Sequence, residues 1–76
     1  MLKKGDRVSI SFRTGKDTSG NYIIDTLPDA EVEEYTGSIL RVRTFEQVPG
    51  PKGDEVEIKH FTFDVNSPEF VGAIHE

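Results

Sequence analysis

Tyr35-Thr36-Gly37-Ser38-Ile39-Leu40-Arg41-Val42-Arg43-Thr44-Phe45 is the stretch that decides the fold of this chain. It is the longest run of strand-forming residues, because β-branched and aromatic side chains fit a pleated sheet well. The apolar positions change parity between Ile39 and Leu40, close to a glycine. Such a change predicts a bulge or sharp bend at Gly37-Ser38 within a run from Val32 to Phe45. We therefore expect a strongly bent strand that pairs with the segments before and after it.

The segment before this stretch begins with a clear strand. Val8, Ile10 and Phe12 alternate with polar residues, and a period of two is typical of a half-buried strand. The alternation is lost from residue 14 to residue 31, where turn-forming residues are frequent. We therefore predict a long loop here, Gly15–Glu31, containing Tyr22-Ile23-Ile24 as a short strand or a segment tucked onto the core.

The segment after it predicts two further strands. Val48-Pro49-Gly50-Pro51-Lys52-Gly53-Asp54 is a strong turn signal, so pairing is expected to stop there and resume at Glu55. Between Glu55 and Val65 the apolar parity switches at Lys59-His60, which predicts that this strand is coiled or bulged. A 3₁₀ turn at Ser67–Phe70 and a short strand at Val71–His75 complete the chain. The fold class is all-β.

Size and composition bound the remaining possibilities. The 76 residues form one small domain, 1–76, and a chain of this size buries only about 60% of its unfolded surface. It has no cysteine and no apolar run of transmembrane length, so we expect a soluble, unprocessed, cytoplasmic protein with no membrane partner. Its net charge of -5 disfavours nucleic acid as a partner, although residues 1–16 and 37–52 are locally basic.

One motif occurs twice. Lys4-Gly5-Asp6-Arg7-Val8-Ser9-Ile10 and Lys52-Gly53-Asp54-Glu55-Val56-Glu57-Ile58 both read K-G-D-x-V-x-I. The first copy is followed by Gly15-Lys16-Asp17 and then by Gly37-Ser38-Ile39-Leu40-Arg41-Val42. Together these segments resemble the opening of SH3-like barrels and are similar to the KOW motif of ribosomal and transcription-elongation proteins. The resemblance implies a small, strongly bent antiparallel barrel of about five strands. From the KOW motif it also implies RNA binding, although the acidic stretch from Asp25 to Glu34 departs from that pattern.

The sequence offers little for catalysis or metal binding. His60 and His75 are the only side chains that titrate near neutral pH when unperturbed, and their spacing does not match a typical metal site. The serines lack the context of an activated nucleophile, and a domain this small rarely encloses a catalytic cleft. We expect no enzyme activity, no catalytic residue, no metal and no cofactor.

Binding is the remaining class of function, and three alternatives stay open. The first is a protein-interaction module, adaptor or regulatory, whose partner-binding surface contains Tyr22, Tyr35, Arg41, Arg43 and Phe45. The second is an RNA- or single-strand-binding module that uses Arg13, Arg41, Arg43 and Lys59. The third is an acidic inhibitor that mimics nucleic acid with Asp25 to Glu34 and Asp54 to Glu57. The alternative to all three is that the arginines only pair with acids across the sheet.

We favour the first, a docking module that is monomeric or a weak homodimer. Small stand-alone β-domains of this kind are often accessory proteins of bacteria or phages, although no residue here indicates either source.

Overall fold

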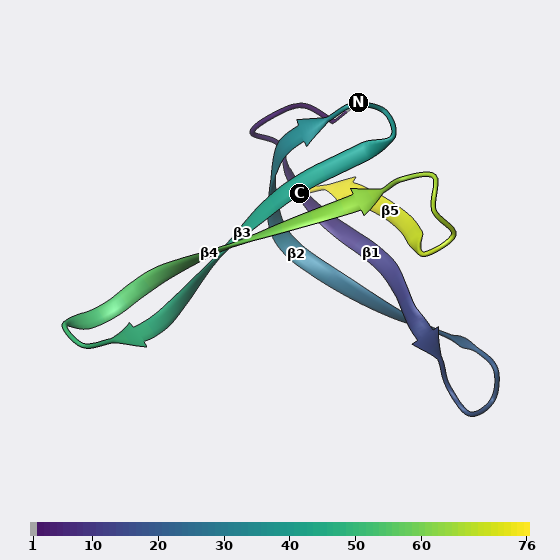
Figure 1. The fold of residues 1–76 in the computed structure, drawn as a ribbon, viewed down its shortest axis with the longest axis horizontal. Helices are drawn as coiled ribbons and strands as arrows, with labels where there is room; N and C mark the ends of the chain where they lie inside the picture. The colour runs from purple at the N-terminus through teal and green to yellow at the C-terminus, as the bar shows by residue number, and fades with distance from the viewer. Residues whose placement is uncertain (1) are drawn as a thin grey trace.

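A computed structural model describes residues 2–76 and shows five antiparallel strands in one sheet (Figure 1). The strands are β1 (Arg7–Lys16), β2 (Tyr22–Tyr35), β3 (Ile39–Gly50), β4 (Gly53–Asp64) and β5 (Phe70–His75). Their order across the sheet is β4-β3-β2-β1-β5. The all-β, antiparallel, five-strand prediction is therefore confirmed. No pairing among the described residues joins β4 to β5, so the sheet is not closed.

The core lies on the inner side of the bend, where β1, β2 and β3 meet. Its fully buried side chains are Val8, Ile10, Ala30, Val32, Leu40 and Val42. The alternation that predicted the first strand supplies Val8 and Ile10, and Phe12 packs against them. Aromatic contacts then link the two ends of the sheet. The ring of Phe63 on β4 lies 5.4 Å from that of Phe12 on β1 and 6.3 Å from that of Phe70 on β5, centroid to centroid.

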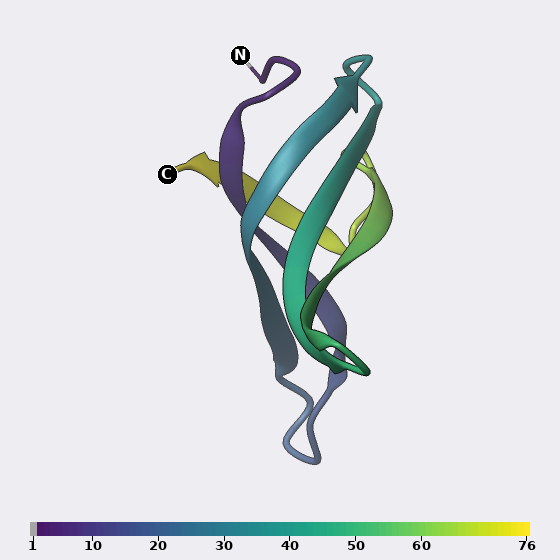
Figure 2. The ribbon, with the colours of Figure 1, turned by 90° about the vertical axis from the view of Figure 1, so that its left-hand side faces the viewer.

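Two hairpin arms extend beyond this core. β2 pairs with β3 only from Glu31 to Tyr35, so residues 13–24 form a β1–β2 arm and residues 44–59 form a β3–β4 arm. Figures 1 and 2 show both arms leaving the core at the same end and diverging. The radius of gyration is 14.4 Å, against about 11 Å for a compact domain of this length. The arms account for the difference.

The β1–β2 arm corrects the prediction of a long loop between Gly15 and Glu31. β1 continues to Lys16 and β2 begins at Tyr22, which leaves only residues 17–21 as a loop. The sequence of this arm does not alternate between apolar and polar residues because neither face of the arm packs against the core. Apolar and polar side chains can therefore occur on both faces. Pro28 is accommodated because it lies at a bulge between β1 and β2, beside Asp29, which has a φ of 54°.

The sharp bend expected at Gly37-Ser38 is present, but as a turn between two strands, and the bulge expected at Lys59-His60 is absent. The run from Val32 to Phe45 is two strands joined by a turn at residues 36–38, in which Gly37 has a φ of 92° that favours glycine. The β3–β4 pairing is continuous from Ile39–Asp64 to Gly50–Gly53, with no irregularity at Lys59-His60. The parity change there marks the point at which β4 leaves the arm and reaches the core, where Phe61 and Phe63 pack.

The turns predicted between β3 and β4 and between β4 and β5 lie close to their expected positions. The hairpin between β3 and β4 is antiparallel, as expected, but Pro49 and Gly50 stay within the ladder and only Pro51 and Lys52 form the turn. Between β4 and β5, Ser67 N–H donates to Asp64 O (3.0 Å) and Phe70 N–H to Ser67 O (3.1 Å). These are hydrogen-bonded turns, and a 3₁₀ turn is not confirmed. The last strand begins one residue earlier than predicted, at Phe70.

Candidate functional site

The outer face of β2, β3 and β4 carries most of the predicted binding residues. Residues opposite each other in an antiparallel pair share a face, and Leu40 and Val42 point into the core. Arg41, Arg43 and Phe45 therefore point outward, opposite Thr62, His60 and Ile58 of β4 in that order. Val56 continues the row along the arm. We call this surface the outer face.

Arg43 and Phe45 form the centre of the outer face. The Arg43 guanidinium lies 5.4 Å from the centroid of the Phe45 ring, within the range of a cation–π contact. Its Nε donates to Glu31 Oε1 at 3.0 Å, and Nη2 contacts the same oxygen at 2.5 Å. The pair is partly exposed, with 38% and 24% of the two side chains accessible. Arg43 is thus held in position by one acid and one ring.

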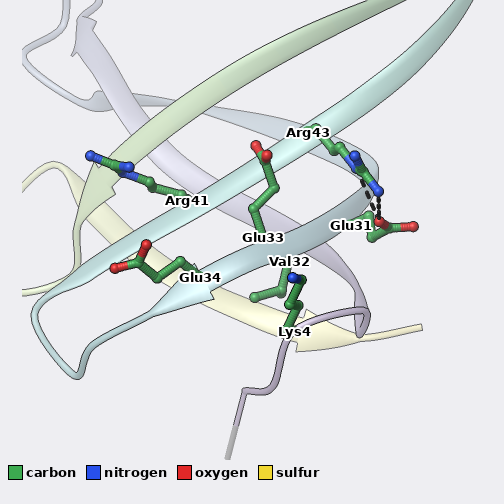
Figure 3. Close-up of a pocket in the computed structure, with 7 residues that line it drawn as sticks. All are labelled: Lys4, Glu31, Val32, Glu33, Glu34, Arg41 and Arg43. Atoms are coloured by element: carbon green, nitrogen blue, oxygen red, sulfur yellow. Dashed lines mark hydrogen bonds and ion pairs between the residues drawn. The ribbon is translucent and has the colours of Figure 1, made fainter.

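A polar hollow lies on the outer face beside this pair (Figure 3). Its volume is about 340 Å³, and it is lined by Lys4, Glu31, Val32, Glu33, Glu34, Arg41 and Arg43. Figure 3 shows Arg41 extending away from the Arg43–Glu31 pair. No ion pair to Arg41 forms among the described residues. Arg41 is therefore the arginine of this face that remains available to a partner.

An exposed apolar row continues the outer face along the β3–β4 arm. Phe45, Ile58 and Val56 are 45%, 47% and 62% exposed. Phe45 and Ile58 are direct cross-strand neighbours. Val56 and Ile58 were not among the predicted binding residues, although the parity change at Lys59-His60 indicates that they lie on the face opposite to Phe61 and Phe63. Exposed apolar side chains next to arginine are typical of protein interfaces.

The other predicted residues lie elsewhere. Tyr22 is on the β1–β2 arm, where Arg13 and Lys16 lie 4.8 Å and 5.0 Å from its ring centroid. Tyr35 pairs with Leu40 and packs against the core, so it points to the inner side of the sheet. The structure thus brings together Arg41, Arg43 and Phe45 and separates Tyr22 and Tyr35 from them.

The four cations proposed for nucleic acid do not form one surface either. Arg13 is on the β1–β2 arm, where its guanidinium also donates to Pro68 O. Lys59 is opposite Thr44 and so faces the inner side of the β3–β4 arm. There it contacts Glu46 at 3.1 Å, and this bond raises the pKa of Lys59. Only Arg41 and Arg43 share a face.

The two histidines form separate pairs. His60 Nδ1 lies 2.8 Å from Glu33 Oε1 on the outer face, and His75 Nε2 lies 3.1 Å from Asp6 Oδ2 at the end of β5. No group of three or more side chains suited to hold a metal ion occurs among residues 2–76.

Asp6 makes folding stability depend on pH. The backbone N–H of Lys3 donates to its carboxylate at 2.9 Å, and this bond, helped by His75, lowers the pKa of Asp6 from the usual 3.8. A carboxyl whose pKa is lowered by folding stabilises the protein above its unfolded pKa, and loses that effect as pH falls through its folded pKa.

We expect the free energy of unfolding to decline below about pH 4 and to decline less in the Asp6→Asn variant. Urea unfolding across an acidic pH series measures both. The Ser67 hydroxyl similarly lowers the pKa of Glu69, so Glu69→Gln should remove a further part of the decline. Parallel curves for wild type and Asp6→Asn would contradict this account.

Comparisons of the chain with protein families, with curated proteins and with solved structures find no match. No helix among residues 2–76 could cross a membrane. The function must therefore be inferred from the geometry of the chain itself.

Proposed function

We propose that this chain is a non-catalytic module that docks a protein partner through the outer face of β3 and β4. The observation that carries the proposal is the exposed row of Phe45, Ile58 and Val56, which runs directly into Arg43 and Arg41. Aromatic and arginine side chains dominate the binding energy of protein interfaces, and they do so at the centre of a contact. The ring of Phe45 under Arg43 fits that role, with Arg41 at its border.

The architecture that we propose for the module is an SH3-like barrel, strongly bent and incompletely hydrogen-bonded. Two features support it: the strand order, with β5 beside β1, and the contacts of Phe63 with Phe12 and Phe70, which bring the two ends of the sheet together. A cytoplasmic accessory role agrees with the lack of cysteine in the chain.

Nucleic-acid binding is the weaker alternative. A groove for single-stranded nucleic acid needs cations that follow one backbone path. Here Arg43 is paired with Glu31, Lys59 is paired with Glu46 on the inner side, and Arg13 is on the other arm. The acidic-mimic alternative is weakened similarly, because Glu31 and Glu33 of its first stretch contact Arg43 and His60.

The docking proposal predicts that Phe45→Glu and Arg41→Glu lose the partner. The tagged protein is incubated with lysate of its source organism, with and without nuclease, and retained proteins are quantified by mass spectrometry. We expect one specific protein whose retention falls roughly tenfold or more in each variant, because interface anchors contribute most of the affinity. Ile74→Glu is the matched control, since Ile74 is 71% exposed and lies on β5, the edge strand at the other end of the sheet from β4 and β3.

Three outcomes would contradict the proposal. Retention that disappears with nuclease, or falls steeply with salt, would favour the nucleic-acid alternative. Retention of a nucleic-acid-binding protein that DNA or RNA displaces would favour the acidic mimic. Equal loss in Phe45→Glu and Ile74→Glu would show that the outer face is not the binding surface.

A further inference from the structure

The far edge of β4 is the longest open strand edge among the described residues. β4 is an outermost strand of the sheet, and its twelve residues, Gly53–Asp64, pair only with β3 among the described residues. Natural edge strands are usually short, charged, or interrupted by proline or a bulge, because an open edge pairs readily with other strands. β4 has no proline and no bulge. Two of its outward side chains, Val56 and Ile58, are apolar and exposed.

We propose that β4 pairs antiparallel with β4 of a second copy of this chain, around a two-fold axis at Ile58. A two-fold axis perpendicular to the sheet keeps each face of the sheet on its own side. Opposite residues must then have the same parity, so the axis passes through a residue and not between two residues. This leaves four candidate positions at the middle of the arm: Val56, Glu57, Ile58 and Lys59.

Charge selects one of these four positions. An axis at Val56 places Glu55 opposite the second copy's Glu57, an axis at Glu57 places two glutamates together, and an axis at Lys59 places two lysines together. Like charges directly opposite each other destabilise a sheet. An axis at Ile58 instead places Glu57 opposite the second copy's Lys59, twice by symmetry. Among the four registers, only this one places opposite charges together without also placing like charges opposite each other.

The same register also extends the apolar row. Phe45 lies opposite Ile58 within one copy, so pairing at Ile58 produces a continuous outer row of Phe45, Ile58, the second copy's Ile58 and its Phe45. On the inner side, Glu57 lies opposite Glu46 within one copy, and Lys59 is bonded to Glu46 alone. The second copy's Lys59 brings a cation to Glu57. Both sides of the sheet therefore favour this contact.

This dimer is independent of the docking proposal, because the outer face stays exposed when two edges pair. A contact along one strand is smaller than the interfaces of permanent dimers, so dissociation should occur within the micromolar to millimolar range.

Charge reversal tests the register. Analytical ultracentrifugation of the wild type, from about 1 µM to about 1 mM, should show the average mass rising toward that of a dimer. Glu57→Lys and Lys59→Glu should each weaken dimerisation about tenfold or more, since each places like charges opposite each other twice. An equimolar mixture of the two variants should dimerise again, because every contact in the mixed dimer joins opposite charges. The double variant Glu57→Lys/Lys59→Glu should do so too.

Two controls keep the result interpretable. Lys16→Glu makes the same charge change as Lys59→Glu, but on the β1–β2 arm, so this variant should dimerise as the wild type does. Circular dichroism should show that each variant keeps the β-sheet, since Lys59→Glu also removes the contact with Glu46. A wild type that stays monomeric throughout the series would overturn the proposal and leave the edge to another occupant, such as an extended peptide of a partner. A dimer that survives both single reversals would overturn it as well.

Discussion

Replacing Leu40 with alanine is expected to remove about 2–5 kcal/mol from the free energy of unfolding, the usual cost of truncating a buried leucine. Leu40 is fully buried and lies at the start of β3, where it faces Tyr35 of β2 and Phe63 of β4. The core is small, so its neighbours cannot fill the space that the side chain leaves. Whole domains have only about 5–15 kcal/mol of stability, and this one lies at the small end of the size range. Leu40→Ala should therefore be partly or wholly unfolded at 37 °C.

Urea unfolding followed by circular dichroism measures this loss. Ile74→Ala is the control, because the same kind of truncation at a side chain that is 71% exposed should change stability by less than about 0.5 kcal/mol. If both variants lost similar amounts, the six buried side chains would not be the source of the stability of the fold.

The sequence predicted the parts of the fold that have a core behind them. Val8, Ile10 and Phe12 alternate because only one side of β1 is buried, and burial sorts apolar and polar residues with a period of two. The turn at Pro51-Lys52 could also be predicted, since proline and glycine fix local geometry without help from distant residues. The all-β class follows from these local signals.

The arms could not be predicted in the same way. Tyr22, Ile23 and Ile24 belong to a long strand, but all three are exposed, so nothing sorts their neighbours by side. On the β3–β4 arm, Val56 and Ile58 do alternate, on the face opposite to Phe61 and Phe63. If every apolar row faced the core, this change from one face to the other would require a bulge. An apolar row that faces solvent has the same pattern.

The candidate site could be predicted only where its residues are close in sequence. Arg41, Arg43 and Phe45 share a face because they are two residues apart on one strand. Tyr22 and Tyr35 lie on a different strand, β2, and their position relative to β3 depends on a pairing register that the sequence does not show. The pairing of Arg43 with Glu31 depends on the position of β2 relative to β3, which is set by the turn at Gly37. Sequence spacing does not reveal such a register.

The Phe63 ring is the link on which the bend of the sheet depends. It contacts Phe12 and Phe70, at 5.4 Å and 6.3 Å between centroids, across a boundary where no two of the described strands pair. The hydrogen bonds near this boundary do not join its two sides: the contact of Arg13 with Pro68 O lies beside the β1–β5 pairing, and Val65 N–H, which donates to Ser38 O at 2.9 Å, extends the β3–β4 pairing. A pair of aromatic rings contributes about 0.5–1.5 kcal/mol beyond the apolar area that it buries. The cluster should therefore stabilise the curvature of the sheet strongly and the β3–β4 hairpin, which has its own ladder, only weakly.

Phe63→Ala should accordingly release β5 before it unfolds the rest of the molecule. We expect a loss of about 2–4 kcal/mol, somewhat below the 3–5 kcal/mol typical of a fully buried phenylalanine, because Phe63 is only half-buried. Hydrogen exchange by NMR separates local from global effects: the amides of Gly72 and Ile74, which face β1, should lose more protection than those of Val42 and Arg43, which lie where β3 pairs with both β2 and β4. Phe63→Leu keeps apolar volume but no ring, and should lose roughly half as much. Uniform loss of protection across β3 and β5 would mean that the sheet unfolds as one unit, and that its curvature does not depend on the aromatic contacts between its ends.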